Sequence, residues 1–187
     1  PVVSIGNIEA GGTGKTPTTI ALARELAARG YRPAIVTRGY RGRLKGVVRV
    51  SPSHRPGDVG DEALLMARAT GLPVIKSPDR VKGALLARDT LDCDLVLLDD
   101  GFQHRRIHRD LDIVLISGDP ASDELLPLGR LREPAGSLQR ADIVIRTKGA
   151  GSGVLSAELV PCSLVDIRGR REDLLVLEGK NVLAVSG

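Results

Sequence analysis

The sequence has few aromatic residues and few cysteines. Aromatic residues make up 2% of its 187 residues, so it offers few rings on which unpaired bases stack, which argues against a nucleic-acid-binding protein. Cys93 and Cys162 have neither CxxC nor CxxH spacing, which argues against a disulfide framework and a structural zinc site. We therefore expect a protein of a reducing, cytosolic compartment that has no nucleic-acid partner.

Long apolar runs are also missing from the sequence. No run approaches the roughly 20 residues that span a bilayer, and no signal peptide opens the chain. Both ends look cut, since Pro1 leads directly into an apolar stretch and the apolar run 181–185 has no continuation. We expect a soluble fragment that is at most peripheral to a membrane.

Composition and charge define what is present. Hydrophobic residues make up 42% of the chain and charged residues 27%, which is typical of a globular domain. The net charge of +4 and the pI of 9.4 predict an anionic partner such as a nucleotide, a phosphorylated substrate or an anionic lipid. Charge alone does not choose among these partners.

Apolar strands alternate with helices along the chain, as in a doubly wound, mostly parallel α/β sheet of the P-loop NTPase type. Strands are predicted at residues 2–5, 33–37, 74–75, 95–98, 111–116 and 143–146, and helices at 17–29, 61–70 and 79–90. Residues 38–55 predict a loop or small hairpin insertion around a short strand at 47–50, residues 119–134 a long connection, and residues 155–167 and 174–185 further strands.

The glycine-rich segment Gly11-Gly12-Thr13-Gly14-Lys15-Thr16 lies between the first strand and the first helix. Such a turn presents backbone N–H groups to phosphate oxygens, while the lysine contacts the β- and γ-phosphates and the threonine hydroxyl contacts Mg²⁺. Glu9 occupies the position of the first glycine in the G-x-x-x-x-G-K-[ST] pattern. We therefore predict a nucleotide-phosphate site and expect the Glu9 carboxylate to point away from it.

Carboxylates follow two other elements. Asp99 and Asp100 end the buried strand at residues 95–98, which is where a Walker-B acid meets the metal, and Asp99 is our preferred metal-side ligand. Asp61 and Glu62 open a helix, where acids often only complement the helix dipole. Because a kinase needs a carboxylate to orient the attacking hydroxyl, Asp61 is also a candidate base.

Two histidines follow the Asp99-Asp100 pair. The spacing of His104 and His108 is that of a zinc pair on a helix, but the HExxH pattern and a third ligand are missing. We favour a role for Gln103 and His104 near phosphate or metal-bound water.

The chain resembles the tetraacyldisaccharide 4′-kinase family through several motifs in the family's order. These are Ser4-Ile5-Gly6-Asn7, the glycine-rich segment with Pro17, Thr37-Arg38-Gly39-Tyr40, Gly60-Asp61-Glu62-Ala63, Asp99-Asp100-Gly101-Phe102-Gln103-His104-Arg105-Arg106, Pro127 and Leu131-Arg132-Glu133-Pro134. The resemblance implies a lipid-sugar kinase that transfers the γ-phosphate of ATP to the 4′-hydroxyl of an acylated disaccharide 1-phosphate. It also implies a peripheral site of action on the cytoplasmic side of an inner membrane.

The resemblance further implies a role for each matching residue. The catalytic residues are Asp61 as base, Lys15 and His104; Gly11, Gly12, Thr13, Gly14, Lys15 and Thr16 bind ATP; Thr16, Asp99, Asp100 and Glu133 face Mg²⁺; and Arg38, Tyr40, Gln103 and Arg132 contact substrate or phosphate. The arginine-rich residues 38–49 bind either the substrate's 1-phosphate or anionic lipid, or are simply solvated.

The family pattern is not matched everywhere. Family members carry a small residue at the position of Glu9, an N-terminal membrane-associating segment and a C-terminal subdomain, so residues 1–187 are expected to be the P-loop kinase core alone. Other readings stay open at this stage. A switch ATPase of the partitioning or nitrogenase-iron-protein type would have its signature lysine where this chain has Ala10. A GTPase would have its guanine-reading aspartate where this chain has Ala150. A nucleotide-binding module without turnover is the third alternative.

Overall fold

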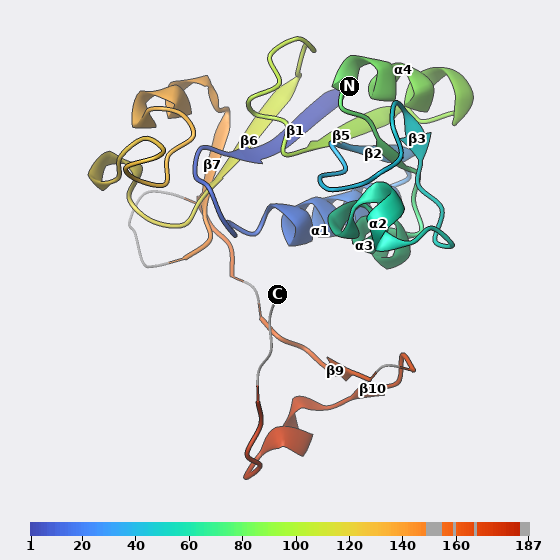
Figure 1. Ribbon diagram of the computed structural model, residues 1–187, viewed down its shortest axis with the longest axis vertical. Helices are drawn as coiled ribbons and strands as arrows, with labels where there is room; N and C mark the ends of the chain where they lie inside the picture. Colours follow the sequence, from blue (N-terminus) through green and yellow to red (C-terminus); the bar gives the residue numbers. More distant parts are fainter. Residues whose placement is uncertain (149–154, 159, 167, 184–187) are drawn as a thin grey trace. The chain divides into compact units, whose positions relative to one another are not determined.

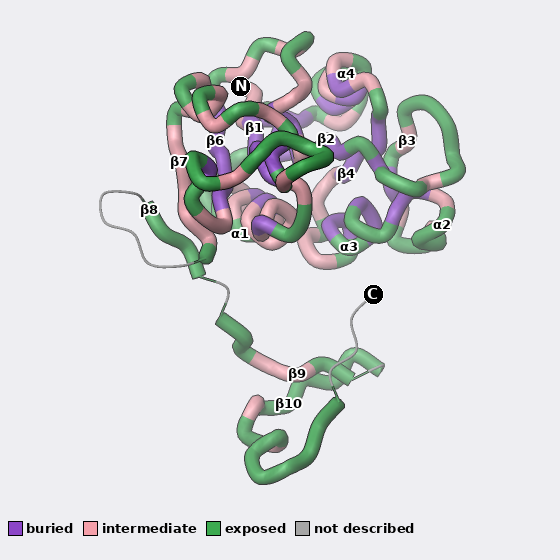
Figure 2. Tube along the Cα trace, turned by 60° about the vertical axis from the view of Figure 1, so that its left-hand side comes forward, coloured by how far each residue is buried: buried purple, intermediate pink, exposed green. Residues whose placement is uncertain are grey.

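The computed structural model describes residues 1–148, 155–158, 160–166 and 168–183. The chain divides into two compact units, Pro1–Ala157 and Glu158–Gly187. The first unit holds the large sheet and its helices, and every motif singled out above lies in it. Figure 2 shows buried residues gathered on the strands and helices of this unit, whereas the described part of the second unit is mostly exposed.

The first unit is built on an eight-stranded sheet of order β3-β4-β2-β5-β1-β6-β7-β8. Its strands are β1 (Val2–Asn7), β2 (Pro33–Thr37), β3 (Val48–Arg49), β4 (Val74–Lys76), β5 (Leu95–Asp99), β6 (Leu111–Ile116), β7 (Ile143–Arg146) and β8 (Leu155–Ser156). All neighbours pair in parallel except β3, which forms one edge of the sheet and pairs antiparallel with β4. The predicted fold class and the insertion before residue 55 are both confirmed.

Helices cover both faces of this sheet (Figure 1). Helices α1 (Lys15–Ala28), α2 (Pro56–Val59) and α3 (Asp61–Thr70) lie on one face, and α4 (Arg80–Thr90) lies on the other. Successive strand residues therefore alternate between two cores: Ile35 and Leu97 pack with α1 and α3, whereas Val36 and Leu98 pack with α4. This burial on both faces explains the unbroken apolar runs of the strands.

The helix ends follow the chemistry of their residues. Helix α1 begins two residues before the predicted start, so that Pro17 stands in its first turn, where a missing N–H costs nothing. Gly30 follows the end of α1 with a φ of 90°, as expected of a glycine after a helix. The Asp79 carboxylate accepts hydrogen bonds from the N–H groups of Val81 and Lys82 and caps α4.

The predicted strands of the last third of the chain are partly wrong. Within the range 155–167, the described residues form two short strands, β8 and β9 (Leu164–Val165), and Pro161 between them has no N–H to donate to a ladder. Residues 174–177 form a 3₁₀ turn, Leu174–Leu177, because the Asp173 carboxylate accepts the N–H of Leu175 at 2.9 Å. Residues 178–183 form no strand, and residues 184 and 185 lie outside the described residues.

The connection between β6 and β7 is fixed to the segment that follows β1. The Ala10 N–H donates to Arg130 O at 2.6 Å, and the Arg132 N–H donates to Ile8 O at 2.7 Å. Ile8, Phe102 and Leu131 pack with β6 in a separate small hydrophobic core. The long connection therefore begins and ends beside the glycine-rich loop. Among the described residues, no helix combines the length and the apolarity that a bilayer crossing needs.

Candidate active site

The glycine-rich loop follows the central strand β1 and runs into α1. Gly11 and Gly14 have φ values of 106° and 83°, a backbone region that residues with a Cβ rarely adopt. A Cβ at Gly11 or Gly12 would meet no atom within 4 Å, so the loop has open space beside these two residues. Since α1 begins at Lys15, the free N–H groups of its first turn lie at the end of this loop.

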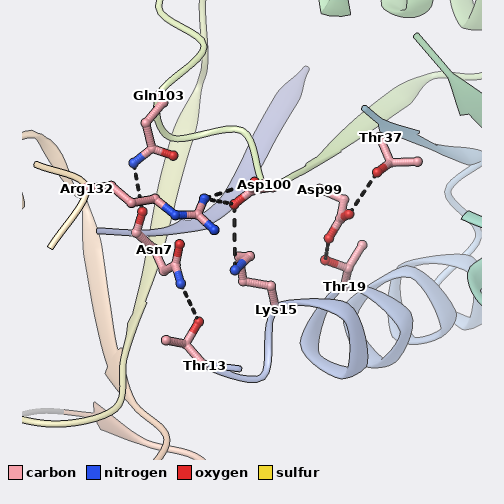
Figure 3. Close-up of polar contacts among 9 residues, drawn as sticks. All are labelled: Asn7, Thr13, Lys15, Thr19, Thr37, Asp99, Asp100, Gln103 and Arg132. Carbon is pink, nitrogen blue, oxygen red and sulfur yellow. Dashed lines mark hydrogen bonds and ion pairs between the residues drawn. The ribbon is translucent and has the colours of Figure 1, made fainter. Parts of the chain in front are cut away.

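Two side chains hold the loop in place. The Asn7 amide donates to the Thr13 hydroxyl at 2.8 Å, and the Thr147 hydroxyl donates to the Thr13 carbonyl at 3.0 Å (Figure 3 shows the first contact). Thr147 belongs to the segment that resembles a guanine-reading motif, whose last position, Ala150, lies outside the described residues. Both contacts fix Thr13, which is buried, directly before the loop's last glycine.

Glu9 is buried at the start of the loop, with 2% of its surface exposed. One carboxylate oxygen accepts the Ser117 N–H at 3.0 Å, and the other accepts the Ser117 hydroxyl. Ser117 directly follows β6, so the carboxylate is bound at the end of that strand. The contact supports the prediction that Glu9 points away from the phosphate side of the loop.

The Asp100 carboxylate forms ion pairs with two cationic side chains. Its carboxylate lies 3.6 Å from the Lys15 ammonium and accepts the Arg132 guanidinium at 3.0 and 3.1 Å (Figure 3). Lys15 comes from α1, Asp100 from the turn after β5, and Arg132 from the long connection before β7. Three predicted site residues from separate parts of the sequence thus meet at the carboxyl edge of the sheet.

Asp99 is the last residue of β5 and is 2% exposed. It accepts hydroxyl hydrogen bonds from Thr37 at 2.9 Å and from Thr19 at 3.4 Å. Burial raises the pKa of Asp99 to about 6, and the nearby charges of Glu62 and Asp100 act in the same direction. The sequence indicated Asp99 but gave no reason to choose Thr19 or Thr37, whose hydroxyls hold it.

Gln103 links the Asp99-Asp100 turn to the loop. Its side-chain amide donates to the Asn7 carbonyl at 2.8 Å, and Asn7 in turn binds Thr13 (Figure 3). Gln103 therefore lies next to the glycine-rich loop, and its partner is the backbone of β1.

Arg80 was not among the site residues predicted from the sequence. It stands at the start of α4, is 4% exposed, and donates to the carbonyl oxygens of Ser77 and Pro78 at 3.1 and 3.4 Å. Burial lowers the pKa of Arg80, while the carboxylates of Asp100 and Asp99 raise it. Its only sequence signal is its place after the end of β4, and an arginine there is usually solvated.

His104 lies beside these charges. Burial, followed by the positive charge of Arg80, lowers the pKa of its imidazole. Its Nε2 is buried and has no hydrogen-bond partner among the described residues. His108 is exposed, and the described residues contain no cluster of three His, Cys, Asp or Glu side chains that could hold a metal ion.

Asp61 stands at the first position of α3 and is exposed. The N-cap residue of α3 is Gly60, which has no side chain to cap the helix, and Asp61 follows it in the first turn. Gly60 before it lies under the arginine-rich segment, since a Cβ there would come within 2.6 Å of the Tyr40 carbonyl oxygen. The neighbouring Glu62 acts on the pKa of Asp99, which relates this helix end to the Asp99-Asp100 turn.

Among the described residues, no hydrogen bond or ion pair joins three predicted site residues to this cluster, although the charge of Arg38 lowers the pKa of Arg80. The Glu133 carboxylate pairs with Arg140, whose guanidinium lies 4.2 Å from the centre of the Phe102 ring. Arg38 is exposed, and the exposed Tyr40 ring carries the Arg41 guanidinium at 5.3 Å. Their roles toward metal and substrate stay predictions.

The oxygen atoms of this site suit Mg²⁺. This ion is usually bound by one or two carboxylates, a hydroxyl and phosphate oxygens, and it keeps several waters. Asp99 and Asp100 are adjacent carboxylates, and the burial of Asp99 favours a cation beside it. Thr16 supplies a hydroxyl from the first turn of α1. The residues present therefore fit a magnesium ion that arrives with a nucleotide.

A glycine-rich loop after the central strand of a doubly wound parallel sheet, with an aspartate at the end of the neighbouring strand, defines a protein of the P-loop NTPase-like class. The family model LpxK, described as tetraacyldisaccharide-1-P 4′-kinase, matches residues 1–187. The chain therefore belongs to the tetraacyldisaccharide 4′-kinase family, and the resemblance seen in its motifs is confirmed.

Similar proteins agree with this assignment. The chain is 40% identical to the tetraacyldisaccharide 4′-kinase of Syntrophus aciditrophicus and 42% identical to that of Chromobacterium violaceum, matching over its full length. It covers 59% and 58% of those relatives. The crystal structure of LpxK from Aquifex aeolicus in complex with ATP superposes with a TM-score of 0.82 at 35% identity, covering 97% of this chain and 61% of that one.

Proposed function

We propose that the protein transfers the γ-phosphate of ATP to the 4′-hydroxyl of a tetraacyldisaccharide 1-phosphate, a step of lipid A biosynthesis. The observation that carries the proposal is the meeting of Lys15, Asp100 and Arg132 beside Asp99, directly at the mouth of the glycine-rich loop. The relatives are named for this reaction, and the chain spans about three fifths of their length, so the activity of the whole protein is inferred from them.

The loop and Lys15 bind the triphosphate. Backbone N–H groups from Gly11 to Thr16 surround phosphate oxygens, and the N-terminus of α1 adds partial positive charge. Lys15 leaves Asp100 for the β- and γ-phosphates, while Arg132 keeps the Asp100 carboxylate neutralised. The Aquifex relative, 35% identical to this chain, forms a complex with ATP, which supports ATP as the nucleotide.

Thr16, Asp99 and Asp100 are the residues that would hold Mg²⁺ with the nucleotide. When bound, the ion neutralises charge on the β- and γ-phosphate oxygens during transfer. The Thr19 and Thr37 hydroxyls orient Asp99 from below and leave Asp100 as the more accessible of the two acids. Glu133 is a further candidate for this group once it leaves Arg140.

Asp61 is the proposed base. In the transfer, the 4′-oxygen of the acceptor forms a bond to the γ-phosphorus, the bond from that phosphorus to the β–γ bridging oxygen breaks, and ADP leaves. The hydroxyl proton passes to the Asp61 carboxylate. Asp61 is exposed at the first position of α3, next to residues 38–42, so an incoming sugar reaches it from solvent, and this supports the role of base.

The remaining predicted contacts fall on the acceptor side. His104, kept neutral by burial and by Arg80, donates or accepts a hydrogen bond at the transferred phosphate without adding charge. Arg38 and Tyr40 follow the end of β2 and are exposed, which supports the proposal that they contact the acceptor's phosphate and sugar. Because the acceptor carries four acyl chains, the reaction takes place at the surface of a membrane, on the cytoplasmic side of the inner membrane, where ATP is present.

The test is a product assay. The chain and the complete Syntrophus aciditrophicus relative are each given Mg-ATP and tetraacyldisaccharide 1-phosphate in detergent micelles, and the bisphosphate product is followed by mass spectrometry. Product from the wild-type chain and none from Lys15→Met supports the proposal. Nucleotide binding without product assigns the chain to binding without turnover, and ATP hydrolysis without lipid phosphorylation favours a switch ATPase.

A further inference from the structure

Three leucines stand exposed on one turn of the connection between β6 and β7. Leu125, Leu126 and Leu128 are 46%, 54% and 84% exposed, and no charged residue lies between Leu125 and Gly129. Single exposed leucines are common on protein surfaces, but three within four residues form an apolar patch that usually has a partner. We call residues 125–128 the leucine turn.

The leucine turn is held by its own hydrogen bonds. Its backbone closes through Leu126 N–H to Leu131 O at 2.8 Å and Leu131 N–H to Glu124 O at 2.9 Å. The Asp123 carboxylate clamps its base, because it accepts the backbone N–H of Arg130 at 3.1 Å and the Arg130 guanidinium at 2.9 Å. The leucines are therefore displayed on an ordered turn, with little backbone N–H left to be desolvated by an apolar partner.

The turn is joined directly to the active site. Residues 130 and 132, which follow it, pair with Ala10 and Ile8 at the start of the glycine-rich loop, and Leu131 bridges Glu9. Arg132 then reaches Asp100. A surface that binds the leucine turn consequently lies beside the place where phosphate is transferred.

A basic segment lies at the same edge of the sheet. Residues 38–49 follow the carboxyl end of β2, as the leucine turn follows that of β6, and the two strands run parallel in one sheet. This segment has no acidic residue, and its five cationic side chains are exposed: Arg38, Arg41, Arg43, Lys45 and Arg49. Apolar side chains and a basic surface at one edge of the sheet suit an anionic bilayer, whose interface offers both acyl chains and negative headgroups.

We propose that the leucine turn inserts into the interface of an anionic lipid bilayer, with the basic segment 38–49 contacting headgroups at the same edge of the sheet. This inference rests on the proposed function, since a tetraacylated acceptor stays in the bilayer and its hydroxyl is reached only by an active site held at the headgroup level. In this proposal, the leucine turn is the surface that holds the active site at the headgroup level.

The experiment uses vesicles and the wild-type chain. Binding is measured by co-sedimentation with phosphatidylcholine vesicles that contain a minor fraction of phosphatidylglycerol, and with phosphatidylcholine alone. The variant Leu125→Ser/Leu126→Ser/Leu128→Ser should lower partitioning into the anionic vesicles by roughly tenfold or more, because binding scales with the apolar area that is buried. The matched control Leu65→Ser/Leu85→Ser removes leucines 55% and 42% exposed on α3 and α4, and should change it by less than about twofold.

A second measurement does not depend on the triple variant. Because the chain has no tryptophan, Leu128→Trp introduces a single fluorescent reporter, and Leu65→Trp provides its control. Emission from Leu128→Trp should shift to the blue on anionic vesicles and be quenched by brominated acyl chains, whereas Leu65→Trp should respond to neither. A reporter at position 128 that stays in water while the chain is bound overturns the proposal.

The outcomes separate this inference from the proposed function. Wild-type-like vesicle binding by the triple variant, or no binding by the wild-type chain, overturns the inference even if the bisphosphate product forms in micelles. Self-association that the triple variant abolishes, in the absence of vesicle binding, assigns the turn to a protein contact and also overturns it. Loss of vesicle binding in the triple variant supports the inference whether or not the micelle assay yields product.

Discussion

The Lys15 ammonium and the Asp100 carboxylate lie 3.6 Å apart, joining the first turn of α1 to the end of β5. Asp100 is also held by Arg132, so it keeps one cation when Lys15 turns to a phosphate. The pair therefore stores Lys15 in a charged, ordered position beside the loop. When nucleotide binds, Lys15 exchanges one anionic partner, the Asp100 carboxylate, for another, a phosphate, and little additional side-chain ordering is needed.

Lys15→Met should weaken ATP binding by roughly 10- to 100-fold, the range for losing a hydrogen bond to a charged group. Isothermal titration calorimetry with Mg-ATP measures the change. Arg24→Met is the control, because Arg24 lies on the same helix and its guanidinium binds the Ala69 carbonyl, away from the loop. Equal ATP affinity in Lys15→Met and the wild type would remove the lysine from the phosphate site.

Asp61→Asn should lower phosphoryl transfer by roughly 10²- to 10⁴-fold, the usual range for a lost general base, while ATP affinity stays near that of the wild type. The carboxylate lies in the first turn of α3, where it complements the helix dipole, so the free energy of unfolding should fall by about 1 kcal/mol or less. Single-turnover kinetics and urea unfolding check the two parts. Transfer at the wild-type rate would leave Asp61 with the dipole role alone.

The sequence predicted those parts of the site that depend on local pattern. The glycine loop, Lys15 and the acids after β5 were found because strand, turn and helix each have a local signature, and parallel strands bring their carboxyl ends to one edge. Thr19, Thr37 and Arg80 were missed because only the packing of α1, β2 and α4 around Asp99 gives them a partner. The pairing of Glu133 with Arg140 depends on folding of the connection before β7 and has no local signal.

Lys76 should control the order of the basic segment. It is buried at the end of β4, donates to the carbonyl oxygens of Gly42 at 3.1 Å and of Leu44, and has its pKa lowered by burial. Lys76→Met keeps most of the side-chain volume and removes both hydrogen bonds. We expect faster amide exchange across residues 38–47 and a higher KM for the lipid acceptor, with the KM for ATP little changed.

Gly39→Ala provides an independent check on this packing. Gly39 has a φ of 67°, and a Cβ there would lie 2.2 Å from Lys76 Cγ, so the alanine displaces the same contact from the loop side. Gly46→Ala is the matched control, because Gly46 has a similar φ of 76° but open space around it. Similar exchange and KM values for the two alanine variants would contradict a role for Lys76.

The raised pKa of Asp99 makes stability depend on pH. The folded pKa of about 6 exceeds the value of 3.8 for a free aspartate, so the stabilising contribution is complete below pH 3.8 and is lost as pH rises through about 6. The shift corresponds to about 3 kcal/mol. Without nucleotide, Asp99→Asn should therefore be up to about 3 kcal/mol more stabilising at pH 8 than at pH 4, by urea unfolding. If the difference in free energy of unfolding between Asp99→Asn and the wild type did not depend on pH, Asp99 would not be desolvated. The same variant should also lose Mg-ATP affinity.

Glu9 should support the loop without contacting the nucleotide. Both of its carboxylate oxygens are bound to Ser117, so Glu9→Ala leaves the half-buried Ser117 N–H without this acceptor and should lower the free energy of unfolding by about 1–3 kcal/mol. Glu9→Gln keeps an acceptor for that N–H and should lose less, while ATP affinity changes by no more than about threefold in Glu9→Gln, a difference of less than 1 kcal/mol. Urea unfolding and calorimetry measure both quantities. A large gain in ATP affinity in Glu9→Gln, with stability unchanged, would mean that the carboxylate repels the phosphates and that its bond to Ser117 gives way when nucleotide binds.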